Sequence, residues 1–99
     1  MPVVKKCIAD GNAYFALDGR LDTVTAPDFE QELKESLDGV TELTLDFENL
    51  EYISSAGLRV LLAAQKTMAN QGGMKVIHVS DMIMEIFEVT GFSEFLTIE

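Results

Sequence analysis

The sequence predicts an α/β domain built on a mostly parallel sheet of four or five strands. Segments with strand composition alternate with segments whose apolar residues recur at helical spacing. The first two strands are separated by a short turn, which places an antiparallel hairpin at one edge of the sheet. A chain of 99 residues, 47% of them hydrophobic, can bury a core without a metal or a disulfide. We therefore expect residues 1–99 to form a single domain with the order β-β-α-β-α-β-α-β, its helices packed on the sheet.

The chain opens with the predicted hairpin. Residues 3–9 and 13–17 have strand composition, and Asp10-Gly11-Asn12 between them supplies turn residues that tolerate positive φ. The segment Gly19-Arg20-Leu21-Asp22 is expected to leave the second strand as a loop.

The first helix is predicted from its start signals and its apolar spacing. Thr25 and Pro27 mark its beginning, and Asp38-Gly39 ends it. Spacings of four, four and three residues define one buried face, which consists of Phe29, Leu33, Leu37 and Val40.

Strands and helices alternate in the second half. Residues 43–47 alternate as a strand, and a helix of strong helix formers runs from Leu58 to Gly72-Gly73. Residues 74–79 form a near-continuous apolar run, which suggests a strand buried on both faces. The predicted inner face of this helix is Leu58, Leu61, Leu62 and Met68.

The last two expected elements are a helix and a strand. Ser80 is placed to cap the third helix and Gly91 to end it, with Ile83, Ile86, Phe87 and Val89 buried. Residues 95–98 are interpreted as a final strand.

Charge and composition exclude several classes of protein. The net charge is −10, and residues 21–53 alone contribute −9, so nucleic acid and anionic membranes would repel the chain. A solvated helix face explains this acidic stretch, and steering of a basic protein partner is the alternative. No apolar run approaches the roughly 18 residues that span a bilayer, and no secretory signal is recognised. A lone cysteine excludes an internal disulfide, so we expect a cytoplasmic protein.

Catalytic candidates are few, and we expect neither an enzyme nor a bound cofactor or metal. No glycine-rich nucleotide-binding motif occurs. His78 is interpreted as a core histidine rather than a general base, and Cys7 as a small buried hydrophobe; a Cys7–His78 dyad is a minor alternative. Asp46, Glu48 and Glu51 have no histidine near them in the sequence to complete a metal site, and a solvated loop explains them.

The most informative stretch is a pair of serines at the start of the second helix. One of them, Ser54, is a suitable N-cap. Ser55 would then lie in the first turn, with an exposed hydroxyl near the positive end of the helix dipole. A phosphate there would be stabilised by free backbone N–H groups while changing what a docking surface accepts.

The segment from Tyr52 to Leu62 resembles the phosphorylation signature of the STAS domain family, in particular bacterial anti-sigma factor antagonists. Gly19-Arg20-Leu21-Asp22 followed by Thr25-Ala26 resembles the family's other recurrent stretch. Many such antagonists read Asp-Ser-Ser-Gly, whereas this chain reads Ser54-Ser55-Ala56-Gly57. The family's final helix is expected to be short or missing here.

The resemblance implies partner switching. An unphosphorylated antagonist binds an anti-sigma factor that is also a serine kinase, phosphorylation abolishes the binding, and a serine phosphatase restores it. The implied phosphoacceptor is Ser55, with Ser54 as the alternative. The alternative function is a STAS module in a lipid-transport or stress-signalling complex. The implied partner-binding residues are Asp22, Thr23, Ser54, Ser55, Ala56, Gly57 and Arg59.

Overall fold

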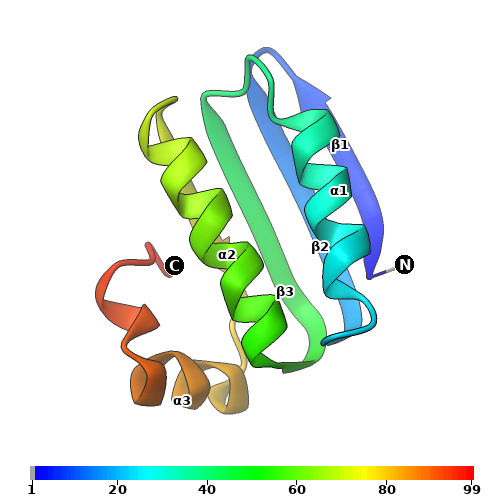
Figure 1. The fold of residues 1–99 in the computed structure, drawn as a ribbon. Coiled ribbons are helices and arrows are strands. Elements are labelled where there is room, and N and C mark those ends of the chain that lie inside the picture. Colours follow the sequence, from blue (N-terminus) through cyan, green and yellow to red (C-terminus); the bar gives the residue numbers. More distant parts are fainter. Residues whose placement is uncertain (1) are drawn as a thin grey trace.

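A computed structural model describes residues 2–99 as a four-stranded mixed sheet with three α-helices (Figure 1). Its strands lie in the order β1-β2-β3-β4; β1 and β2 form the antiparallel hairpin, and the other neighbours are parallel. The predicted α/β class and edge hairpin are therefore confirmed. The elements are β1 (Val3–Ala9), β2 (Asn12–Leu21), α1 (Ala26–Ser36), β3 (Glu42–Ile53), α2 (Ser55–Ala69), β4 (Gly73–Ile77), α3 (Asp81–Thr90) and a short 3-10 helix (Phe92–Glu94).

Helices α1 and α2 lie side by side over one face of the sheet (Figure 1). Strands expose alternate residues to opposite faces, so β2 and β3 direct one set of apolar side chains at these helices. The helices bury Phe29 and Leu33 from α1, and Leu61 and Met68 from α2. The buried strand residues include Ala13, Phe15, Leu17, Leu43, Leu45 and Phe47.

Helix α3 begins and ends as its sequence predicts. The Ser80 hydroxyl accepts a hydrogen bond from the Ile83 N–H at 3.2 Å, and Gly91 ends the helix with a φ of 83°. Its buried side is narrower than expected, because only Ile83 and Phe87 are buried, with the Phe87 ring 6.4 Å from that of Phe47. The prediction that Val89 is buried is wrong, since this residue is 80% exposed. None of the helices in residues 2–99 is long and apolar enough to cross a membrane.

Strands β2 and β3 are longer than the sequence pattern suggests. The prediction of a loop over residues 19–22 is wrong for residues 19–21, because β2 continues to Leu21. Strand β3 likewise runs to Ile53, and the two strands stay paired to their ends, with Leu21 opposite Ile53. Buried Leu50 and Ile53 hold this extension against the core. Helix α2 then begins at Ser55 with Ser54 as its N-cap, which confirms the start predicted from the serine pair.

The C-terminal segment differs from the expected fifth strand. The 3-10 helix Phe92–Glu94 precedes residues 95–98, where Ile98 forms only an isolated parallel bridge with Val76. Strand β4 ends at Ile77 and alternates between buried and half-buried residues, so the expected burial on both faces is also wrong. The chain turns sharply at His78, whose φ is 58°. This turn explains why the apolar run does not continue as a strand.

Candidate functional site

The two sequence stretches that resemble the family motifs lie at the same end of the sheet. Strands β2 and β3 are parallel neighbours, so the segments that follow their carboxyl ends are side by side. The Ser54 N–H donates to the Leu21 carbonyl at 2.9 Å and joins the two segments directly. Gly57 is buried where α2 approaches Leu21. Its contribution to the site is therefore this close approach.

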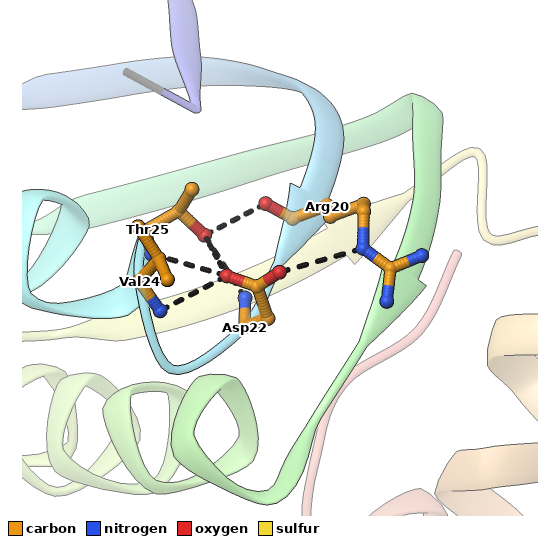
Figure 2. A network of polar contacts seen from close by, with 4 residues as sticks. All are labelled: Arg20, Asp22, Val24 and Thr25. Carbon is orange, nitrogen blue, oxygen red and sulfur yellow. Dashed lines mark hydrogen bonds and ion pairs between the residues drawn. The ribbon is translucent and has the colours of Figure 1, made fainter.

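A tight polar network holds the turn after β2 (Figure 2). Asp22 Oδ1 accepts from the N–H groups of Val24 and Thr25, at 3.0 and 3.2 Å. The Thr25 hydroxyl accepts from the Asp22 N–H at 2.9 Å and donates to the Arg20 carbonyl at 2.7 Å. The Thr25 N–H contributes most to holding the pKa of Asp22 below its ordinary value, helped by Val24 and Arg20. The Arg20 guanidinium lies 4.4 Å from the centre of the Tyr52 ring.

Because the pKa of Asp22 is lowered from 3.8, its charge stabilises the folded state above that pH, and the contribution is lost as the pH falls through the lower folded value. We expect Asp22→Asn to reduce stability at about pH 7, and the difference from the wild type to shrink as the pH falls below 3.8 and through the lowered pKa of the folded state. Urea unfolding of both proteins across this range is the measurement. A difference that stayed constant with pH would show that the carboxylate charge contributes nothing.

The two serines have different environments. Ser54 is the N-cap of α2, but its Oγ is buried and has no hydrogen-bond partner among residues 2–99. Ser55 is exposed at the first helical position. Early helical N–H groups lack intrahelical acceptors, and within the described residues no hydrogen bond reaches those of Ser55 and Ala56. The first turn also carries no acidic residue. This helix end is therefore suited to an added negative charge.

The buried hydroxyl of Ser54 predicts an unusual result for an N-cap. Ser54→Ala is expected to change the free energy of unfolding by less than about 0.5 kcal/mol, because the hydroxyl makes no hydrogen bond that would be lost. Ser80→Ala, which removes a working cap, is expected to cost about 1 kcal/mol. Urea denaturation measures both variants, and an equal loss in the two would contradict this interpretation.

A shallow depression of about 220 Å³ lies between the start of α1 and the first turns of α2. It is lined by three of the residues predicted to bind a partner, Thr23, Ala56 and Arg59, so the fold brings both sequence stretches onto one surface. Val24 lies in the same turn and is 82% exposed, although sequence reasoning overlooked it. The sequence does contain a signal for this residue, because Val24 is an apolar residue inside an otherwise polar turn.

Two predictions about reactive side chains are wrong. Cys7 is exposed on β1, an edge strand, and is not a buried hydrophobe. His78 lies beyond the end of β4, with 55% of its side chain exposed, and is not a core histidine. Strands β1 and β4 form opposite edges of the sheet, which separates the two residues and excludes a catalytic dyad.

The prediction that Asp46, Glu48 and Glu51 lie in a solvated loop is also wrong, since all three belong to β3. Asp46 is buried, and His78 lies beside it, with 2.8 Å between Nδ1 and Oδ1. The hydrogen bond to Asp46 is the main reason that the pKa of His78 is raised. Burial alone would raise the pKa of Asp46, but hydrogen bonds from Tyr14 and His78 hold it below its ordinary value.

Comparison with known proteins identifies relatives along most of the chain. The family model of the STAS domain matches residues 4–99. BtrV of Bordetella bronchiseptica is 36% identical over 85 residues, which cover 84% of this chain and 73% of BtrV. The anti-sigma-B factor antagonist of Staphylococcus aureus is 31% identical over 80 residues, covering 79% of this chain and 74% of that protein.

Solved structures show the same fold. The unphosphorylated form of the anti-sigma factor antagonist SpoIIAA has a TM-score of 0.75 at 16% identity, over 96% of this chain and 86% of that one. The phosphorylated form of SpoIIAA from Bacillus has a TM-score of 0.73 at 17% identity, over 96% and 89% of the two chains. Because the family model spans residues 4–99 and two sequence relatives cover most of the same length, this chain belongs to the STAS domain family.

Proposed function

We propose that this protein is an anti-sigma factor antagonist that binds an anti-sigma factor with serine kinase activity and is released by phosphorylation of Ser55. A serine phosphatase would restore the binding form, and transcription is controlled through the sigma factor that the partner holds. The observation that carries the proposal is the exposed Ser55 hydroxyl at the start of α2, where the backbone N–H groups of Ser55 and Ala56 have no acceptor among residues 2–99.

The phosphoacceptor is assigned to Ser55 because of access. A kinase has to reach the hydroxyl oxygen, and the Oγ of Ser54 is buried. A phosphate on Ser55 carries about −1.5 to −2 charge and lies at the positive end of the α2 dipole, so the fold tolerates it. The S. aureus relative, named as an anti-sigma-B factor antagonist, supports the role, and the phosphorylated form of SpoIIAA supports the modification.

The partner surface is assigned to the residues around Ser55. Asp22 orders the adjacent turn, and the depression lined by Thr23, Ala56 and Arg59 offers a concave contact. The exposed Val24 adds an apolar contact at the edge of this surface. A dianion on Ser55 would place charge and bulk within the contact area without disturbing the core beneath it. These features support a switch that changes binding and leaves the fold intact.

Phosphorylation with the cognate anti-sigma factor kinase and ATP tests the assignment. Intact mass is expected to increase by one phosphate in the wild type and in Ser54→Ala, and to stay unchanged in Ser55→Ala. Ser54→Ala is the matched control, because it removes the neighbouring hydroxyl from the same helix start. Phosphate that persists in Ser55→Ala, or a kinase that neither binds nor modifies the wild type, would reject the proposal. In the second case a STAS module in another complex becomes the better explanation.

A further inference from the structure

A cluster of side chains of the kinds that bind metals lies on β3 and just after β4. Ser55 follows the carboxyl end of β3, so the cluster is separate from the proposed phosphorylation site. Asp46 on β3 is paired with Ile77 on β4, and His78 is the next residue along the chain. The positive φ of His78 accompanies a ring that points back to Asp46, with Nδ1 2.8 Å from Oδ1. Asp46 Oδ1 also accepts from the Glu48 N–H at 3.0 Å. One ligand atom from each of Asp46, Glu48 and His78 lies within 4.8 Å of the others.

We propose that Asp46, Glu48 and His78 bind one divalent transition-metal ion, with zinc as the reference ion. The donor set consists of two carboxylates and one imidazole, which suits Zn²⁺ and its first-row neighbours better than the all-oxygen preference of Mg²⁺ or Ca²⁺. The two carboxylate charges match the charge of the ion. The remaining coordination position is left to water.

The fixed part of the site is Asp46. This residue is only 7% exposed, and the Tyr14 hydroxyl from the adjacent strand donates to Oδ2. The hydroxyl therefore orients the carboxylate and leaves Oδ1 directed at His78. Hydrogen bonds of this kind around a ligating carboxylate tune metal affinity in known sites. Asp46 is thus held in place before any ion arrives.

The movable part consists of His78 and Glu48, both exposed. Bonds of about 2.0–2.1 Å in a tetrahedral site separate neighbouring ligand atoms by about 3.3 Å. His78 Nδ1 and Asp46 Oδ1 are 2.8 Å apart, so they need to separate by only about 0.5 Å to admit the ion. An exposed imidazole makes that adjustment without repacking the core.

The histidine that completes this cluster is distant in the sequence. Asp46 and Glu48 have no histidine near them in the chain, and His78 reaches them only because β3 and β4 are parallel neighbours. The proposal does not depend on phosphorylation of Ser55, so failure of either idea leaves the other in place.

Calorimetric titration with ZnCl2 in a non-chelating buffer near neutral pH tests the site. The full chain carries Cys7→Ser in every sample, because the exposed thiol could bind zinc by itself. We expect one zinc ion per chain, and binding of MgCl2 at least about 100-fold weaker. His78 is the only histidine, so its imidazole NMR signals report directly whether the ion binds there.

His78→Asn is the principal variant, because asparagine tolerates positive φ and preserves the backbone. It is expected to weaken zinc binding at least tenfold, and Glu48→Gln to weaken it several-fold. Glu51→Gln removes an exposed carboxylate from the same strand, outside the cluster, and is expected to leave the affinity unchanged. Unsaturable binding, unshifted His78 signals, or wild-type affinity in His78→Asn would overturn the proposal.

Discussion

Ser55→Glu is expected to weaken binding to the proposed anti-sigma factor partner by about 100-fold or more, because an uncompensated charge buried in an interface costs several kcal/mol. The Ser55 side chain is exposed, and it lies at the N-terminal end of α2, where the helix dipole favours an anion. The melting temperature is therefore expected to stay within a few degrees of the wild-type value. Binding is measured by calorimetry with the purified partner, and stability by circular dichroism.

Thr67→Glu is the matched control for this charge. Thr67 is exposed near the other end of the same helix, so a glutamate there changes the net charge equally but lies away from Ser55. We expect this variant to bind within about threefold of the wild type, because distant exposed charges act only through screened electrostatics. Equal weakening by both variants would show that net charge, and not the position at Ser55, controls binding.

The sequence predicted those elements whose pattern is local. The hairpin, the caps of α3 and the apolar face of α1 all depend on residues within a few positions of one another. The start of α2 was also accessible, because adjacent serines before a run of helix formers indicate a helix N-terminus. The exposure of Ser55 was also predicted and is confirmed, whereas the structure was needed to show that the Ser54 hydroxyl is buried without a hydrogen-bond partner among residues 2–99.

Features that depend on strand pairing were missed. The extension of β3 to Ile53 contains polar residues such as Glu48 and Glu51, and only its pairing with β2 makes it a strand. The contact between His78 and Asp46 joins residues 32 positions apart, so no sequence spacing indicates it. The C-terminal residues have strand composition, but the 3-10 helix before them leaves one bridge where a strand was expected. Composition does not determine which backbone groups find a partner.

A methyl group at Gly57 is expected to destabilise the protein, although alanine is the better helix former. A Cβ there would lie 2.7 Å from the Leu21 carbonyl oxygen, 2.8 Å from Ile53 Cγ1 and 2.9 Å from Leu21 Cγ. Both neighbours are buried, so the overlap costs about 3 kcal/mol, the upper end of the range for overpacking. The gain in helix propensity returns about 1 kcal/mol, which leaves a net loss of about 2 kcal/mol for Gly57→Ala in urea denaturation.

Gly73→Ala supplies the comparison, because the chemical change is identical and the surroundings differ. Its Cβ would meet only the flexible end of Glu42, at 3.4 Å, so we expect a change between zero and a gain of about 1 kcal/mol. Gly57→Ala also forces α2 away from Leu21, which strains the hydrogen bond from the Ser54 N–H and moves Ser55 relative to Asp22. A Gly57→Ala protein as stable as the wild type would mean that α2 tolerates this shift, and that the close approach of the two segments is not required for the fold.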